Sequence, residues 1–363
     1  VKKWVGLGLS CLLLTGCWDE RQLKDQNIIF GVAIDAPSKG EITLTYAIPQ
    51  PGSESQPAST KKVISATGRT VRESASKIDQ KVGTDTQIGK IRVVLLSKES
   101  VQQDIYPLLD KYYRNASSPL NAKIIITEGE AESFFRNELE GEPLYSNYYA
   151  AMIKSAESLA LVPKTNIQLF ASPLLDEGED AMAPLIKFNK EEKVAEVTGT
   201  ALFHNKHMVE ELSVAETTVL LLMKDEKGKE TVLTFPVEKE ESITIRVEKM
   251  KRKMNVHVPK DGPVTVDLSY QLSYRVTDYP PDHLEDKKEV KKVNKKLSDQ
   301  IEQSMDKTMD KIKEANSDVL GIGRKVNAKD PDRFKQLKWE TAYPEVNVKI
   351  HVKAELIESG ITF

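Results

Sequence analysis

The sequence holds little of what disulfide-stabilised or nucleic-acid-binding proteins require. Only two cysteines occur in 363 residues, which excludes a disulfide framework. The 52 Lys and Arg nearly balance the 55 Asp and Glu, whereas a nucleic-acid-binding protein normally carries a basic excess. Hydrophobic residues make up 39% and charged residues 29%, which is typical of a folded chain and unlike a disordered or multi-span membrane protein. The length allows two or three domains.

Recognisable catalytic motifs are also missing. The sequence has no Gly-x4-Gly-Lys-Ser/Thr loop, no Cys-x-x-Cys, no His-Glu-x-x-His and no Gly-x-Ser-x-Gly. Gly321-Ile322-Gly323 lacks the third glycine of a dinucleotide-binding loop, so we expect a tight turn there. His204 and His207 flank an expected hairpin turn, with no carboxylate or thiol at ligand spacing. Three Ser-x-x-Lys pairs occur without their partner motifs: Ser59/Lys62, Ser74/Lys77 and Ser304/Lys307. We therefore expect no enzyme activity, no cofactor and no metal site.

Long hydrophobic runs are absent as well. No stretch reaches the roughly 20 apolar residues that a membrane-spanning helix needs. Lys2 and Lys3 precede a short uncharged run over Trp4–Gly16, and a charged stretch opens at Asp19. A positive start followed by a short apolar run predicts a secretory signal peptide over residues 1–16.

The end of that run identifies a candidate modification site. Leu14-Thr15-Gly16-Cys17 resembles a bacterial lipobox, in which the cysteine receives a diacylglyceryl group and becomes the first mature residue. Cys11 would leave with the signal peptide, so Cys17 would be the single cysteine of the mature chain. A thioether to lipid explains such a lone cysteine in an exported protein. We predict lipidation at Cys17, and two acyl chains would anchor the protein stably.

The mature chain contains clear strand and helix patterns. We predict an N-terminal α/β domain over residues 17–193. Strand patterns alternate with amphipathic helices, which predicts a partly parallel sheet. The expected strands are 27–35, 41–48, 91–96 and 122–127, with a surface loop at 49–60; the expected helices are 70–82, 100–113 with a kink at Pro107, 130–137, 145–159 and 166–175.

Residues 194–363 predict an α+β domain, with a possible split near residue 258. Apolar and polar residues alternate strictly over 264–276 and 346–356, as in half-buried strands. We expect residues 243–258 to form a hairpin with the basic run Lys249–Lys253 as its turn. The remaining expected elements are a hairpin turn at 205–206, a helix over 214–223, a strand over 229–237 and a helix after Asp330-Pro331.

A long amphipathic helix is expected between the last two strands, with Asp282 as its N-cap and Glu285 three residues on. Lysines cluster in its first half: Lys287, Lys288, Lys291, Lys292, Lys295 and Lys296. They are interpreted either as a face for a partner or an anionic membrane, or as the solvated outer face of a helix packed on a sheet. The second interpretation is favoured because acidic residues balance the second half of the helix.

Several short segments together resemble the GerC-type spore germination lipoproteins. They begin with Cys17–Leu23 and Asn27–Asp35 and span nearly the whole mature chain in order; the others are Ala66–Thr70, Gly89–Val93, Gly199–Phe203, Asn316–Gly323, Trp339 and Tyr343–Val346. Lys90 departs from the family pattern, in which a histidine is common at that position.

The resemblance implies the C subunit of a nutrient germinant receptor. Such a subunit is a lipoprotein at the outer face of the spore inner membrane, where it works with two integral membrane subunits, A and B. Family members have a multi-domain mixed α/β fold, and no catalytic activity is attached to them. Only Cys17 carries over as a functional residue.

Two other functions remain as alternatives. The chain could be a solute-binding lipoprotein that captures the small-molecule germinant itself, which needs a concave pocket with converging polar groups. An exported cell-wall hydrolase is least favoured, because the sequence shows no clustered nucleophile, base or metal-ligand set.

Overall fold

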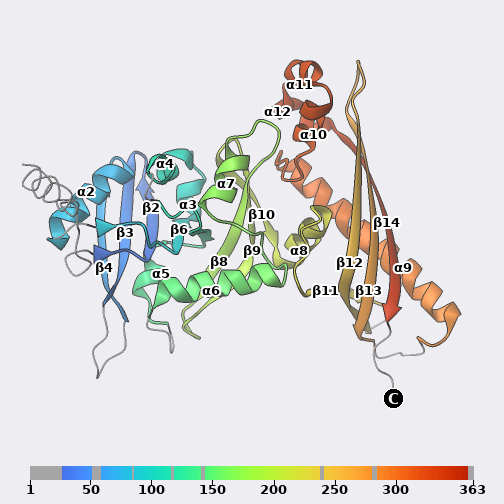
Figure 1. Ribbon diagram of the computed structural model, residues 1–363, viewed down its shortest axis with the longest axis horizontal. Helices are drawn as coiled ribbons and strands as arrows, with labels where there is room; N and C mark the ends of the chain where they lie inside the picture. Colours follow the sequence, from blue (N-terminus) through green and yellow to red (C-terminus); the bar gives the residue numbers. More distant parts are fainter. Residues whose placement is uncertain are drawn as a thin grey trace, which may run out of the picture.

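The computed structural model describes residues 27–50, 59–83, 86–115, 118–139, 144–237, 241–279 and 284–358. The signal peptide and Cys17 lie outside these residues, as does most of the expected loop at 49–60. An eight-stranded sheet occupies one side of an elongated molecule, and a four-stranded sheet with a long helix occupies the other (Figure 1). The mixed α/β fold predicted from the sequence is confirmed.

The large sheet has parallel strands at its centre and antiparallel hairpins at both edges. Its strand order is β10-β9-β8-β7-β6-β2-β3-β4, and the neighbours β2, β6, β7 and β8 pair in parallel. The strands are β2 (Gly31–Ser38), β3 (Glu41–Gln50), β4 (Ser59–Gly68), β6 (Val93–Ser97), β7 (Lys123–Thr127), β8 (Met182–Asn189), β9 (Val194–His204) and β10 (His207–Ser213). β1 (Asn27–Ile28) and β5 (Thr86–Gln87) form a separate short pair. The sequence patterns did not predict β4, β5 or β8.

Helices cover both faces of this sheet. In β6, Val94 and Leu96 share a core with helices on one face, whereas Val93 and Leu95 share a second core with α5 and α6 on the other. Burial on both faces explains why β6 reads as a continuous apolar run. The helices are α2 (Val71–Val82), α3 (Lys98–Val101), α4 (Tyr106–Arg114), α5 (Ser133–Arg136), α6 (Tyr145–Ser158) and α7 (Ile167–Leu174).

One expected helix is two. The predicted helix over 100–113 is divided into α3 and α4, and Pro107 lies in the first turn of α4. Proline lacks an N–H and is tolerated in the first turn, where no intrahelical acceptor is needed. Pro107 therefore begins a helix and does not kink one.

The large sheet also crosses the domain boundary that we predicted at 193/194. That position lies in the turn between β8 and β9, which pair from Met182–Leu202 to Asn189–Val194. β9 and β10 thus extend the sheet of the N-terminal segment, and α8 (Val214–Met223) leads from β10 toward the small sheet.

The small sheet has the order β11-β12-β13-β14. Its strands are β11 (Thr231–Pro236), β12 (Ser242–His257), β13 (Thr265–Asp278) and β14 (Asn347–Glu358). The chain between β13 and β14 forms the helices α9 (Lys287–Glu314), α10 (Ile322–Lys329), α11 (Pro331–Leu337) and α12 (Trp339–Ala342) and the 3-10 turn η2 (Tyr343–Glu345). Alternate residues such as Leu268 and Tyr270 share a core with Leu297 and Ile301 of α9.

Side chains of α9 also cover the outer edge of the small sheet. Three backbone N–H groups of β14 donate to Asn294, Ser298 and Glu302, at distances of 2.9–3.0 Å. These three positions repeat every four residues and so lie on one stripe of the helix. An open strand edge invites unwanted pairing, and the helix satisfies this one.

Two predictions for this region are wrong. Residues 242–257 form one strand instead of a hairpin, because Lys251 and Lys253 continue the pairing with Gln271 and Ser269 of β13. Their side chains alternate with partly buried residues, so the basic run reads as one face of a strand. The N-cap of α9 is Asp286, which accepts from the Lys288 N–H at 2.8 Å, and Asp282 is not described.

Candidate functional site

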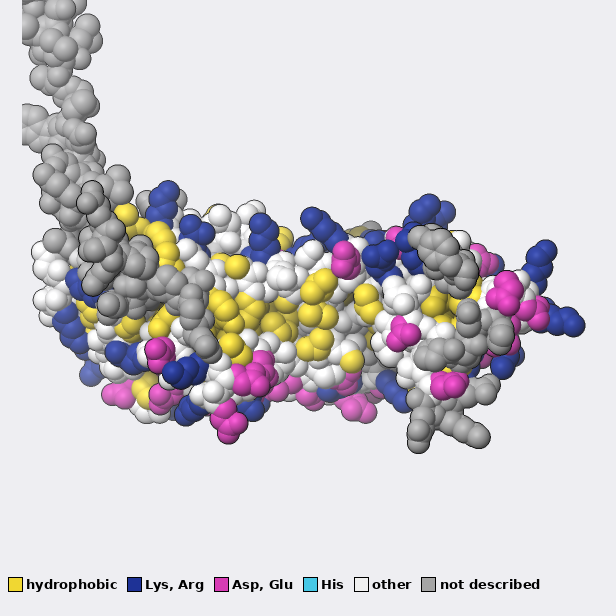
Figure 2. Space-filling view, turned by 90° about the horizontal axis from the view of Figure 1, so that it is seen from below, with side chains coloured by type: hydrophobic (Ala, Val, Ile, Leu, Met, Phe, Trp, Pro, Cys, Tyr) yellow, Lys and Arg dark blue, Asp and Glu magenta, His cyan; other side chains and the backbone are white. Residues whose placement is uncertain are grey.

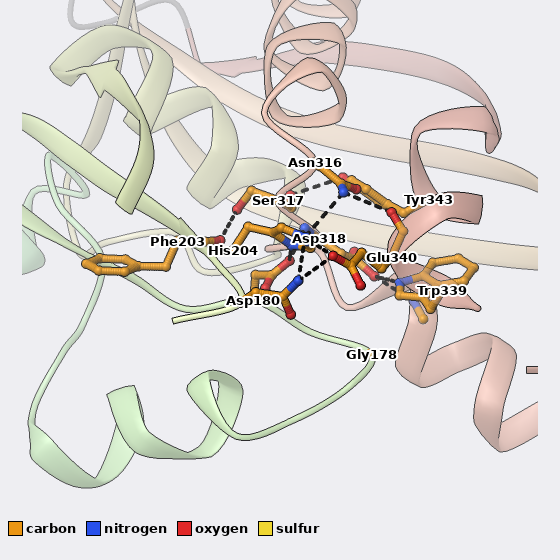
Figure 3. Close-up of polar contacts among 12 residues, drawn as sticks. Gly178, Asp180, Phe203, His204, Asn316, Ser317, Asp318, Trp339, Glu340 and Tyr343 are labelled. Atoms are coloured by element: carbon orange, nitrogen blue, oxygen red, sulfur yellow. Dashed lines mark hydrogen bonds and ion pairs between the residues drawn. The ribbon is translucent and has the colours of Figure 1, made fainter. Parts of the chain in front are cut away.

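A cluster of hydrogen-bonded polar side chains lies where the end of the large sheet meets the C-terminal helices (Figure 3). It draws on four separate stretches of chain, and we call it the joint. Its members are Gly178, Asp180, Phe203, His204, Asn316, Ser317, Asp318, Gly323, Trp339, Glu340 and Tyr343.

Glycines allow the backbone of the joint to pass closely. Gly321 has a φ of +65°, in the left-handed region, and is the N-cap of α10 (Ile322–Lys329). A Cβ on Gly323 would lie 2.4 Å from Trp339 Nε1 and 2.8 Å from Gly178 Cα. The tight turn predicted for Gly321-Ile322-Gly323 is confirmed, and the close approach of Trp339 explains the second glycine.

Asp318 is the centre of the joint. It is 2% exposed, and its carboxylate accepts from Gly323 N–H at 2.7 Å, Ile322 N–H at 2.9 Å and Trp339 Nε1 at 3.0 Å. Burial raises the pKa of Asp318 to about 8, although these three donors act in the opposite direction. One side chain thereby satisfies the first turn of α10 and the indole of α12.

Asp180, which precedes β8, joins Asp318 through the backbone and through charge. Its Oδ2 accepts from the Asp318 N–H at 2.8 Å, and its own N–H donates to the Asp318 carbonyl at 3.1 Å. The negative charge of Asp180 adds to the upward shift of the Asp318 pKa. These paired contacts connect the large sheet directly to the segment after α9.

Neighbouring residues complete the connection. Ser317 Oγ donates to the Phe203 carbonyl at 2.7 Å, and the Tyr343 hydroxyl donates to the Ser317 carbonyl at 3.1 Å. Burial raises the pKa of Tyr343 far above its ordinary range, so its hydroxyl remains a donor. At the rim, Arg324 Nε lies 2.8 Å from Asp176 Oδ2, and Lys224 Nζ lies 3.2 Å from Glu179 Oε1.

Asp180, His204 and Ser317 are the residue types of a catalytic triad, but their geometry differs from one. His204 Nδ1 lies 3.3 Å from Asp180 Oδ2, as in an Asp–His pair. The other ring nitrogen faces the side-chain amides of Asn205 and Asn316, at 3.0 and 3.2 Å. Ser317 Oγ donates to the Phe203 carbonyl, and no hydrogen bond in the described chain joins it to His204. The contacts of these three residues connect separate parts of the chain.

The fold brings carboxylates to His204 that sequence spacing did not place there. Glu340 Oε1 lies 4.0 Å from His204 Nε2, on the opposite side of the ring from Asp180. Among the described residues, no group of three or more His, Cys, Asp or Glu could hold a metal ion. Asp180 and Asp318 are far apart in sequence and belong to no motif, so only their tertiary contact identifies them.

Other sequence candidates also have structural roles where they are described. Ser74 Oγ donates to the Ile42 carbonyl and Ser304 Oγ to the Gln300 carbonyl, each at 2.8 Å. Neither hydroxyl is directed to the lysine of its Ser-x-x-Lys pair by any hydrogen bond in the described chain. No helix of the described segments has the length and apolarity needed to cross a membrane.

These features define a two-sheet protein in which the joint connects the large sheet to the C-terminal helices. Residues 19–188 match the family described as spore germination protein N-terminal domain, and residues 198–360 match the family described as spore germination B3/GerAC like, C-terminal. The chain therefore belongs to the GerAC family of spore germination proteins, and the resemblance found in the sequence is confirmed. It is a spore germination protein of the GerC type, a family not known to be enzymatic.

Individual relatives agree with this assignment. The spore germination protein GerQC of Bacillus cereus is 25% identical over 227 residues, which are 62% of each chain. The putative spore germination protein YfkR of Bacillus subtilis is 25% identical over 244 residues, 63% of this chain and 62% of that one. The matches thus span less than two thirds of these relatives. The crystal structure of the GerBC protein superposes with a TM-score of 0.60 at 19% identity, covering 93% of this chain and all of that one, which supports the fold.

Proposed function

We propose that this chain is the lipid-anchored C subunit of a nutrient germinant receptor. It acts by contact with two integral membrane subunits at the outer face of the spore inner membrane and helps to start germination. The observation that carries this proposal is the pair of family matches, over residues 19–188 and 198–360.

The surface supports a function by contact. Figure 2 shows hydrophobic side chains gathered along the middle of the face on which α6 lies. A shallow groove of about 510 Å³ opens there, and its apolar lining includes Tyr148, Met152 and Leu159 of α6 and its C-cap together with Leu161 and Val197. Contiguous exposed apolar surface of this kind is typical of protein–protein contact sites.

Lipidation would make weak contacts sufficient. A tether confines the protein near its partners, and the raised local concentration substitutes for intrinsic affinity. Two acyl chains would give stable retention, whereas a single chain would be marginal. The modification at Cys17 is therefore the first element of the proposal to test.

Cys17→Ala is expected to abolish retention in the spore membrane fraction and to impair nutrient-triggered germination. Cys11→Ala is the matched control, because Cys11 would be removed with the signal peptide and its substitution should change neither property. Membrane fractions washed in high salt would be probed for the protein. A Cys17→Ala variant that stays in the membrane after the wash would contradict the anchor.

A further inference from the structure

A second charged region lies near β3 and β4, at the end of the large sheet opposite the joint. A cavity of about 730 Å³ opens between the start of α2 and one face of α4. Its apolar wall includes Ile42, Val71 and Pro107. Four cationic side chains line the same space: Arg69, Arg72, Lys111 and Arg114. The volume is in the range of small-molecule sites, which are commonly apolar with a few converging polar groups.

Most of the nearby acids are already engaged. Asp110 forms an ion pair with Arg114 at 2.8 Å, and Glu73 forms one with Lys77 at 2.8 Å. Within the described chain, Arg69 and Arg72 make no side-chain ion pair, and both are exposed at the rim. Glu73 also accepts from the Arg69 backbone N–H at 2.9 Å, so among the described residues the cationic residues of the cavity that lack an ion pair and a carboxylate hydrogen bond are Arg72 and Lys111.

Lys111 is the most constrained of these cations. It is half-buried, and its Nζ donates to the hydroxyl of the fully buried Tyr46 at 3.0 Å. Burial, with Arg72 nearby, lowers the pKa of Lys111 to about 8, and Asp79 of α2 acts in the opposite direction. Asp79 Oδ1 also accepts from the Thr86 hydroxyl at 2.7 Å. A half-buried ammonium that meets a neutral hydroxyl is stabilised by an incoming anion.

We propose that the cavity between α2 and α4 binds a small organic anion, a carboxylate or phosphate monoester with a short apolar body. Lys111 and Arg72 hold the charged group, Arg69 closes the rim, and the wall formed by Ile42, Val71 and Pro107 receives the apolar part. This inference is independent of the proposed lipid anchor and membrane partners, because its evidence is the lining of this cavity.

Calorimetric titration of the full chain, purified in detergent, tests the site with butyrate and with propyl phosphate, which are a carboxylate and a phosphate monoester that each carry a short apolar body. Sodium chloride at equal ionic strength is the control ligand. We expect saturable binding of at least one organic anion, weakened tenfold or more in Lys111→Met and about threefold to tenfold in Arg72→Gln. Lys335→Gln, an exposed lysine of α11, should bind as the unchanged protein does.

Three results would overturn the proposal. In the first, neither organic anion gives saturable heat. In the second, both cavity variants bind as tightly as the unchanged protein. In the third, the protein binds only to vesicles that contain phosphatidylglycerol. The last result would assign the cations to lipid headgroups. Arg72 is exposed, so Arg72→Gln keeps the test decisive even if Lys111→Met folds poorly.

Proton uptake gives a second readout. An anion beside Lys111 raises the pKa of its ammonium, so binding at pH 8 should take up protons from the buffer. Titrations in buffers of different ionisation enthalpy measure this uptake. It should disappear in Lys111→Met, whereas uptake that persists there would place the anion elsewhere.

Discussion

The joint and the α2–α4 cavity both contain several charged side chains, but they differ in whether those side chains have partners within the protein. In the joint, the carboxylate of Asp318 meets three donors, and Asp180 meets a backbone N–H and His204. In the cavity, Arg72 and Lys111 meet no carboxylate in an ion pair within the described chain. A polar cluster whose partners are internal holds the fold together, whereas one whose partners are missing is prepared for a ligand.

This difference has an energetic basis. A buried polar group contributes little net stability while its hydrogen bonds are made, but leaving its partners unsatisfied is costly. Substitutions in the joint should therefore reduce stability, and substitutions in the cavity should reduce binding and leave stability nearly unchanged.

Asp318→Ala should have the largest effect on folding. It would leave the Ile322 and Gly323 N–H groups and the Trp339 indole without an acceptor, at a cost of more than about 3 kcal/mol in the free energy of unfolding. Urea denaturation measures this loss, with the exposed Asp332→Ala as control. A loss below about 1 kcal/mol would remove the joint from its structural role.

Gly323→Ala should have the next largest effect. The new methyl group would lie 2.4 Å from Trp339 Nε1 and would force the indole away from Asp318. Overpacking of this kind costs about 1–3 kcal/mol. The same denaturation experiment measures it, and the near-ultraviolet circular dichroism of Trp339 should change. Unchanged stability together with an unchanged spectrum would show that the close approach is not required.

The joint should also make stability depend on pH. Because the folded pKa of Asp318 is about 8 and its ordinary value is 3.8, the native state binds a proton that the unfolded state releases in this window. The contribution of Asp318 to the free energy of unfolding is therefore fully present below about pH 4, and it is lost as the pH rises toward 8. Melting temperatures across this range should fall more steeply for the unchanged protein than for Asp318→Asn. Equal slopes would mean that Asp318 keeps its charge when buried.

In the cavity, Lys111→Met should change stability by less than about 1 kcal/mol. The variant relieves the burial of an ammonium near Arg72 but leaves the Tyr46 hydroxyl without its partner, and these effects oppose each other. Urea denaturation at pH 7 measures the result. A loss comparable to that of Asp318→Ala would show that Lys111 is structural, and the contrast between the two regions would disappear.

Local patterns predicted much of the fold. The alternation over β13 and β14 and the apolar stripe of α9 each depend on a short stretch of chain, and all three elements form as expected. The basic run in β12 was misread as a turn because a solvated strand face and a solvated turn have the same composition. Only its pairing with β13 separates the two.

The candidate sites divide in the same way. Cys17 belongs to a contiguous motif, so the sequence alone is enough to predict it as a lipidation site. The joint could not be predicted, because Asp180, His204 and Asp318 come from distant segments and each looks ordinary in its own surroundings. The cavity combines Arg72 of α2 with Lys111 of α4, which only the packing of the two helices brings together.

The proposed role as a tethered receptor subunit is tested by crosslinking in intact spores, followed by mass-spectrometric identification of the proteins attached to this chain. We expect integral membrane subunits of a germinant receptor among the crosslinked partners, and we expect them to be lost from the products when Cys17 is changed to Ala. Products that contain no integral membrane protein, or that are the same with and without Cys17, would contradict a tethered subunit acting by contact.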